Sequence, residues 1–334
     1  MKFRPARILS PLATDLINTV QGGFPLHEKP FQVLADKLDC RPEQIIDTLH
    51  KLLHDRWLTR FGPLYDAAAL GGGLTLAAVC VDEAHYDAVA ELINAHPEVA
   101  HNYRREHELN MWFVIATESA VQVAATIDEI QRETDLRVFD FPKQREFYVG
   151  LWLQIEDGHI STVPVPVPDH TASTGFDEHA VDRKLIRQTQ AGIPLTATPW
   201  CDIARALGVD PGFVLERMQH MLDAGIIRRI GVVPNHYKMG LRANGMTVWD
   251  VADEDVERVG DIIGQLDFVS HCYQRPRHLP EWRYNLFAMV HGHDHDEVDD
   301  KVAMIARTLG DTCIAHDVLY SSRILKKTGL RIAA

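Results

Sequence analysis

Two short segments of the sequence place histidine, tyrosine and arginine on alternate residues. HNYRREH spans residues 101–107 and HCYQRPRH spans residues 271–278. Side chains at alternate positions of a β-strand point to the same face of the sheet. Each segment therefore predicts one polar strip. The first strip consists of His101, Tyr103 and Arg105, and the second strip of His271, Tyr273 and Arg275.

These three residue types suit an acidic ligand that must gain a proton. Arginine binds carboxylates through paired hydrogen bonds. Imidazole exchanges a proton near neutral pH or ligates a metal ion, and tyrosine can donate a proton. The alternative is that both strips only pack in a core, since duplication also repeats core residues. Further polar or aromatic candidates in or near the two segments are Arg104, His107, Trp112, Arg277, His278, Trp282, Arg283 and Tyr284.

The two segments belong to two copies of one larger unit. GGFPL at residues 22–26 matches AGIPL at residues 191–195, and the same offset aligns Pro42 with Pro211. His101 aligns with His271 after one inserted residue. A further insertion between residues 275 and 284 makes the second segment longer and more charged. Since irregular hairpin loops often carry binding groups, this loop is expected to contribute to the site.

The duplication predicts an α+β protein of five segments. Winged helix-turn-helix domains are expected at residues 1–65 and 179–234, and ferredoxin-like (βαββαβ) domains at residues 66–156 and 235–334. Alternating valine and proline predict a semi-rigid linker over residues 157–178. The two ferredoxin-like domains are expected to pair face to face as an internal pseudo-dimer.

Hydrophobic periodicity supports the ferredoxin-like order of elements in each copy. The first copy predicts strands or helices at residues 74–82, 83–95, 99–106, 110–117, 121–134 and 136–149. The second copy predicts them at residues 244–252, 253–264, 268–275, 283–291, 295–308 and 312–325.

The charge pattern argues against a nucleic-acid partner. The chain has a formal net charge of −13, whereas DNA binders usually carry a basic surface. Both expected DNA-reading helices, within residues 41–56 and 210–223, contain as many acidic as basic residues or more. The second has Arg217 alone against three acidic residues.

Other patterns exclude further classes of site. No phosphate-binding GxxxxGK[ST] motif occurs, and no apolar run approaches the roughly 20 residues of a membrane helix. The five cysteines lie far apart, which favours reduced thiols and a cytoplasmic protein. HGHDHDE at residues 291–297 suggests either a metal cluster or a polar loop that caps a helix; we favour the loop and expect no protein-bound metal.

The order of domains resembles the Lrp/AsnC architecture, and the two segments resemble something more specific. VAHNYRREHELNMWFV at residues 99–114 and VSHCYQRPRHLPEWRYNLFAMVHG at residues 269–292 are similar to the signature segments of siroheme decarboxylases of the AhbA/AhbB and NirD/NirL types. The resemblance covers nearly the whole chain except the linker. It implies a fused form of a two-subunit enzyme. Gln274 stands where many relatives are expected to carry arginine.

The resemblance implies that the carboxyl groups of the C12 and C18 acetates of siroheme are removed, giving 12,18-didecarboxysiroheme for heme d1 or heme synthesis. Siroheme is the substrate, and no cofactor is expected. His101, Tyr103, His271 and Tyr273 would handle protons, although a histidine could instead ligate the siroheme iron. The remaining candidates, with Asn110 added by the resemblance, would bind the substrate. A homo-oligomer and other heme d1 biosynthesis proteins are further candidate partners.

Two other functions remain as alternatives at this stage. A regulator of the Lrp/AsnC type that senses a tetrapyrrole would bind DNA tightly and in a salt-sensitive manner. A tetrapyrrole chaperone would bind siroheme without altering it.

Overall fold

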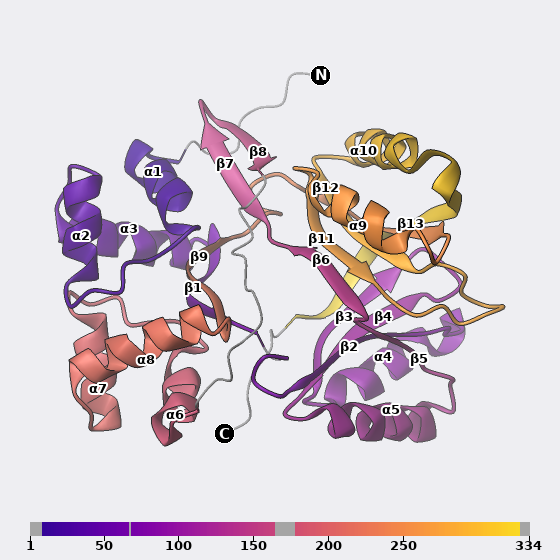
Figure 1. Cartoon of the computed structure of the whole chain (residues 1–334), viewed down its shortest axis with the longest axis horizontal. Coiled ribbons are helices and arrows are strands. Elements are labelled where there is room, and N and C mark those ends of the chain that lie inside the picture. Colours follow the sequence, from indigo (N-terminus) through magenta and orange to yellow (C-terminus); the bar gives the residue numbers. More distant parts are fainter. Residues whose placement is uncertain (1–8, 67, 164–177, 328–334) are drawn as a thin grey trace.

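The molecule has two lobes, one built from both helix-turn-helix copies and one from both ferredoxin-like copies (Figure 1). The structure is a computed structural model that describes residues 9–66, 68–163 and 178–327. The helical lobe contains α1 (Pro11–Val20), α2 (Pro30–Lys37), α3 (Pro42–His54), α6 (Ala180–Thr189), α7 (Pro199–Leu207) and α8 (Pro211–Asp223). Within the described residues, no helix is long and apolar enough to cross a membrane.

The helix boundaries follow from local sequence signals. Proline occupies the first turn of α1, α2, α3, α7 and α8, where a missing amide hydrogen costs nothing. The two copies then share one apolar core, in which the aligned residues Phe31 and Trp200 are fully buried. Phe24 packs edge-on against Phe61 at 4.9 Å between ring centroids. The lobe is therefore a single packed unit.

The expected wings differ from the prediction. Each copy supplies only one strand after its helices, β1 (Leu58–Tyr65) and β9 (Ile227–Pro234). The two strands pair with each other, antiparallel, with Gly62 opposite Gly231. Because each copy supplies one such strand, the strand has no partner within its own copy. Its backbone N–H and C=O groups instead bond the strand of the other copy, and this pairing replaces two separate wings.

The second lobe is one nine-stranded sheet with the order β5-β2-β4-β3-β13-β10-β12-β11-β6. The first copy contributes β2 (Gly73–Val79), β3 (Val99–Arg105), β4 (Met111–Thr117), β5 (Phe139–Pro142) and β6 (Arg145–Val149). The second contributes β10 (Ala243–Val251), β11 (Val269–Gln274), β12 (Leu286–Gly292) and β13 (Cys313–Lys327). Each copy therefore keeps the strand order of the split βαβ arrangement, which is β5-β2-β4-β3 in the first copy and β13-β10-β12-β11 in the second.

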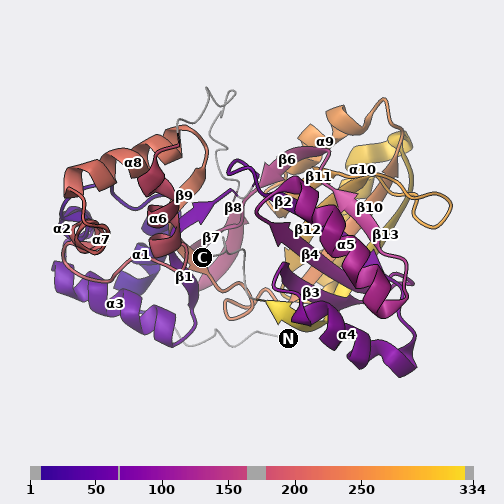
Figure 2. The same ribbon diagram turned by 90° about the horizontal axis from the view of Figure 1, so that it is seen from below.

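Helices cover the outer faces of the sheet, and the inner faces meet (Figure 2). The helices are α4 (Tyr86–Ala95), α5 (Ala120–Thr134), α9 (Val256–Gly264) and α10 (His295–Leu309), with short 3-10 turns η1 (Glu83–His85) and η2 (Gly310–Thr312). An apolar cluster with members from both copies, including Trp112, Phe141 and Phe287, fills part of the space between the inner faces. The face-to-face pseudo-dimer is thus confirmed.

The two copies also exchange strands. The first part of β13 pairs with β10 of its own copy, and its last part crosses to β3, with Ser321 opposite Arg105 and Lys327 opposite His101. Likewise β6 leaves the first copy and pairs with β11, with Glu146 opposite Tyr273. The two strips therefore each lie beside a strand of the other copy.

The predicted linker starts too early. Residues 157–163 belong to a hairpin formed by β7 (Trp152–Glu156) and β8 (His159–Val163), in which Glu156 pairs with His159. Asn18 of α1 and Gln21, directly after α1, hydrogen-bond the backbone of Ile155 and Leu153 and so satisfy the free edge of β7. Residues 164–177, which include the prolines of the valine-proline run, lie outside the described residues.

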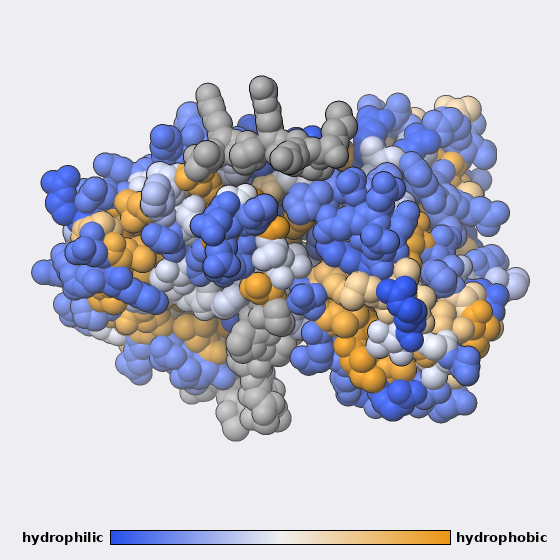
Figure 3. Space-filling view, turned by 90° about the horizontal axis from the view of Figure 1, so that it is seen from above, coloured by the Kyte–Doolittle hydropathy of each residue, from blue (hydrophilic) through white to orange (hydrophobic). Residues whose placement is uncertain are grey.

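The surface is consistent with the acidic, polar composition. Figure 3 shows hydrophilic side chains over most of one face, with smaller apolar areas on both lobes. Exposed large apolar side chains are spread over several elements, for example Val33, Val121 and Ile314. Scattered exposed apolar residues of this kind are usual in globular proteins.

Candidate functional site

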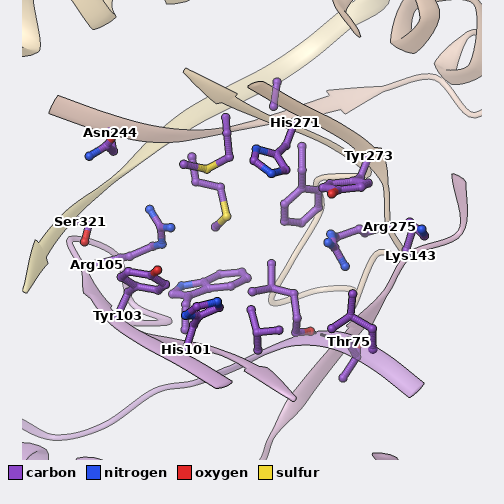
Figure 4. Close-up of a pocket in the computed structure, with 18 of the residues that line it drawn as sticks. Thr75, His101, Tyr103, Arg105, Lys143, Asn244, His271, Tyr273, Arg275 and Ser321 are labelled. Atoms are coloured by element: carbon purple, nitrogen blue, oxygen red, sulfur yellow. Dashed lines mark hydrogen bonds between the residues drawn. The ribbon is translucent and has the colours of Figure 1, made fainter. Parts of the chain in front are cut away.

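Both strips line the same cavity, which lies between the inner faces of the sheet and has a volume of about 410 Å³. His101, Tyr103 and Arg105 come from β3, and His271 and Tyr273 from β11, with Arg275 directly after it. Figure 4 shows the two strips on opposite walls. Trp112 of β4 also lines the cavity. The structure thus joins seven predicted residues of the two strips and β4 in one site.

The two strip arginines are held by backbone carbonyls of the opposite copy. Arg105 donates from Nη1 to Leu319 O at 2.6 Å, and Arg275 donates from Nη1 to Phe141 O. Burial lowers the pKa of each guanidinium to about 10, so both remain charged at neutral pH. Within the described residues neither forms an ion pair, and Nε of each is buried without a hydrogen-bond partner. Each therefore has donors left for an anion.

The histidines of the cavity are neutral when it is empty. Burial lowers the pKa of His101 to about 4, and the charge of Lys327 adds to this effect. Burial also lowers the pKa of His271 to about 4, with Glu146 opposing and Arg228 and Arg275 assisting. Neutral imidazoles accept protons or ligate metal ions, and they donate a proton only from the ring N–H.

The tyrosines of the strips are protonated for the same reason. Burial raises the pKa of Tyr103 and of Tyr273. The arginine of each strip lies over the ring of its tyrosine, at 5.7 Å for Arg105 and 4.8 Å for Arg275. The phenols are therefore hydrogen-bond donors placed next to a cation.

Sequence reasoning missed several cavity residues because they come from other elements. Beside the first strip lie Tyr237, which follows β9, and Lys327 of β13. His236 precedes Tyr237 and packs against His291. Beside the second strip lie Lys143, Glu146 and Arg228, which form ion pairs with one another, and Asp66. Asn244, His291 and Ser321 complete the polar lining. The residues on β6 and β13 could be found only from the strand exchange.

Eight predicted residues do not line the cavity. Arg104 forms an ion pair with Glu83 at 2.7 Å, and Asn110 bonds the backbone of Val81 in both directions. The others belong to or pack against the loop between β11 and β12, namely His107, Arg277, His278, Trp282, Arg283 and Tyr284.

The contacts of the β11–β12 loop explain why its predicted residues do not line the cavity. Arg277 and Arg283 both bind Asp250 of β10, at 2.5 Å and 2.6 Å. His278 Nε2 bonds Asp140 O at 2.7 Å, and Trp282 is fully buried against Trp112. The charges of the insertion thus close the end of the sheet lobe, and none of the predicted residues of this loop lines the cavity.

The histidine-rich segment at residues 291–297 caps a helix, as favoured. Asp294 precedes α10 and accepts a hydrogen bond from Glu297 N at 2.9 Å. No group of three or more metal-ligating side chains occurs among residues 9–66, 68–163 and 178–327. One member of the segment, His291, points elsewhere and lines the cavity.

The basic residue of the second expected reading helix is engaged within the helical lobe. Arg217 is the one basic residue noted in the second reading helix, and it forms an ion pair with the fully buried Asp182 at 2.6 Å. Its guanidinium is thus directed into the lobe instead of toward a phosphate.

Two family profiles match the sequence. That of the AsnC-like ligand binding domain covers residues 70–148 and 238–326. That of the siroheme decarboxylase NirDL-like HTH domain covers residues 14–58 and 182–228. Both profiles match twice, as the duplication requires.

Curated relatives and solved structures agree with the profiles. The siroheme decarboxylase of Hydrogenobacter thermophilus is 32% identical over 324 residues, which cover 95% of this chain and 93% of the relative. The siroheme decarboxylase NirH subunit of Pseudomonas aeruginosa is 58% identical over 151 residues, 45% of this chain and 88% of that subunit. The crystal structure of the siroheme decarboxylase NirDL in complex with an iron-uroporphyrin III analogue superposes with a TM-score of 0.69 at 27% identity, over 95% of this chain and 92% of that one.

Proposed function

The chain belongs to the siroheme decarboxylase family, and we propose that this decarboxylase removes the carboxyl groups of the C12 and C18 acetates of siroheme. The product would be 12,18-didecarboxysiroheme, a precursor for heme d1. The observation that carries the proposal is the pair of arginines on opposite sides of one cavity, the buried Arg105 and the half-buried Arg275. A buried guanidinium without a carboxylate partner is costly, so a ligand carboxylate is its natural counter-ion.

The two arginines would orient the substrate. Siroheme carries several carboxylates around its ring, and groups that do not react can bind while one that reacts is held in place. Because each arginine is fixed by a carbonyl of the opposite copy, the guanidinium planes keep their positions without a ligand. Trp112 and Phe287 of the same cavity supply flat apolar surface for the macrocycle.

The reaction needs one proton for each CO2 released. The acetate C–C bond breaks, the electron pair enters the macrocycle, CO2 leaves, and the remaining methylene takes up a proton to become a methyl group. The macrocycle is itself the electron sink, so we propose that the enzyme needs no cofactor besides its substrate. His101, Tyr103, His271 and Tyr273 are the groups proposed to deliver or receive protons.

Substrate binding would change the protonation of the histidines. A carboxylate placed within a few ångströms favours the imidazolium form. Since the pKa values of His101 and His271 are about 4 in the empty cavity, binding of a polyanion would raise them toward neutrality. The site would thus take up protons on binding the substrate, and decarboxylation of the substrate requires protons.

One chain is proposed to do the work of a pair of subunits. The NirH and NirG subunits of Pseudomonas aeruginosa each match less than half of this chain, and the cavity needs strands from both copies. Other heme d1 biosynthesis proteins and a second copy of the chain remain proposed partners. The five unpaired cysteines support the proposed cytoplasmic location.

The test is anaerobic incubation of the purified protein with siroheme, followed by mass spectrometry. We expect two successive losses of the mass of CO2 and new methyl signals at C12 and C18 in the NMR spectrum of the product. Unchanged siroheme would refute decarboxylation, and loss from other side chains would refute the assigned positions. Arg323→Gln is a suitable control, because Arg323 forms an exposed ion pair with Asp87 and lies outside the cavity lining.

A further inference from the structure

A chain of hydrogen bonds runs behind His271 and away from the cavity. Ser270 Oγ lies 2.9 Å from His271 Nδ1 and 2.7 Å from His291 Nε2. His291 Nδ1 in turn bonds Asn244 Oδ1. Ser270, His291 and Asn244 are all buried. Buried polar groups linked in this way fix one another's orientation, because each unsatisfied member would cost free energy.

The donor and the acceptor of each hydrogen bond follow from the last residue of this series, Asn244. The Asn244 atom that lies against His291 Nδ1 is the amide oxygen, which can only accept a hydrogen bond. His291 must therefore donate from Nδ1. Burial keeps the pKa of His291 well below its usual value, so this ring is neutral and its Nε2 accepts from Ser270.

We propose that Ser270, His291 and Asn244 are positioning residues that hold His271 in the tautomer with its proton on Nδ1. Ser270 gives its hydrogen to His291 Nε2 at 2.7 Å in preference to Met289 O at 3.5 Å, so its oxygen accepts from His271 Nδ1. A neutral His271 then presents the bare Nε2 to the cavity. In this state His271 can accept a proton or ligate iron, and it is not the donor of the proton that the product methyl gains. This inference rests on the proposed function and narrows the role of one residue in it.

The first copy lacks the side chains that form this series of hydrogen bonds. The strand registers place Leu74 where the second copy has Asn244, and Ala116 where it has His291. Ala100 precedes His101 as Ser270 precedes His271. Nδ1 of His101 is buried without a hydrogen-bond partner. The same strand framework thus carries a histidine with a fixed tautomer in one copy and a free one in the other.

Other charged groups face His271 and must be counted in its titration. Glu146 of β6 favours the imidazolium, whereas Arg228 of β9 and Arg275 oppose it. His236, after β9, and His291 both interact with His271 electrostatically. With burial as the largest influence, His271 stays neutral at pH 7, so its tautomer is a defined property there.

The experiment measures the tautomer in the ligand-free protein by histidine ¹⁵N NMR at pH 7, with the His271 signals assigned by their loss in His271→Gln. We expect protonation on Nδ1 in the native protein and a shift toward the Nε2–H form in Ser270→Ala. Ser270→Thr, which keeps a hydroxyl, should restore the native spectrum. Thr126→Ala removes a buried hydroxyl on α5, outside the cavity lining, and should leave it unchanged.

A native His271 that carries its proton on Nε2, or on both nitrogens, would overturn the proposal. So would a Ser270→Ala protein in which Nδ1 remains fully protonated. If that variant does not fold, Asn244→Leu replaces it, since the first copy holds leucine at the equivalent strand position. Because no substrate is present, this failure is distinct from a failure of the decarboxylation assay.

Turnover provides a second readout. Ser270→Ala should lower kcat about tenfold with a smaller change in KM, the effect of losing one buried hydrogen bond at a reacting group. Ser270→Thr should recover most of the loss. Equal losses in the alanine and threonine variants would show a packing role instead of a positioning role.

Discussion

The two strips present the same three residues to one cavity but have different surroundings. The first strip lies beside Lys327 and Tyr237, and no carboxylate interacts with Arg105 within the described residues. The second strip lies beside Glu146, which binds both Lys143 and Arg228. Duplication therefore copied the three side chains of the strip, while the strands that cross from the other copy gave each set its own electrostatic environment.

The different surroundings suggest that the two halves of the cavity have different roles. The half of the cavity at the first strip is cationic without compensation, which suits carboxylate binding. The half at the second strip contains ionised Glu146: burial raises the pKa of this group, but the bonds and charges of Arg228 and Lys143 outweigh that effect and lower it to about 2. Together with the hydrogen-bonded His271, this half is the more rigid of the two.

Removal of either strip histidine tests whether both halves take part in turnover. We expect His271→Ala and His101→Ala each to lower kcat by about 10²-fold or more with a small change in KM, as for loss of a general acid or base. Steady-state and single-turnover kinetics with siroheme measure the loss. A full effect in one variant and none in the other would show that the second histidine only packs.

Substitution of the strip arginines tests the electrostatic part of the comparison. Arg105→Gln should raise the Kd for siroheme about 10- to 100-fold, the value of one to two charged hydrogen bonds. Arg275→Gln should raise it less, because Asp140 and Glu146 already act on Arg275. Absorbance titration of siroheme gives both constants. A larger effect at Arg275 would reverse the assignment of the binding half.

The pH dependence of stability tests the burial of the histidines. Folded His271 has a pKa of about 4 against about 6.5 in the unfolded chain, so between these values only the unfolded state binds the proton. Stability should therefore fall as pH decreases from 6.5 to 4, by about 2 kcal/mol at pH 5 for this one group. Denaturant unfolding of the native protein and of His271→Leu at pH 7 and pH 5 measures the difference. The leucine variant should lose less stability on acidification, and an equal loss would contradict the assigned burial.

The sequence predicted the strips better than their surroundings, for a physical reason. Strand alternation is local, so His101, Tyr103 and Arg105 could be placed on one face from their spacing alone. Glu146 and Lys327 reach the cavity only because β6 and β13 pair with strands of the opposite copy, and nothing in their local sequence indicates that register. Likewise, the ion pair of Arg277 could not be predicted from local sequence, because its partner Asp250 lies on another strand.

Glu146→Gln offers the finest test of the comparison, because it makes the second half of the cavity resemble the first. Loss of the carboxylate frees Lys143 and leaves Arg228 paired with Asp66 alone, so binding of siroheme should tighten a few-fold. Loss of partly buried ion pairs should lower stability by about 1 kcal/mol. Lys143 would then be available to substrate carboxylates. Titration and thermal unfolding measure the two effects in one protein. Weaker binding would show that Glu146 itself contacts the substrate or its proton, and the second half would then be the reacting one.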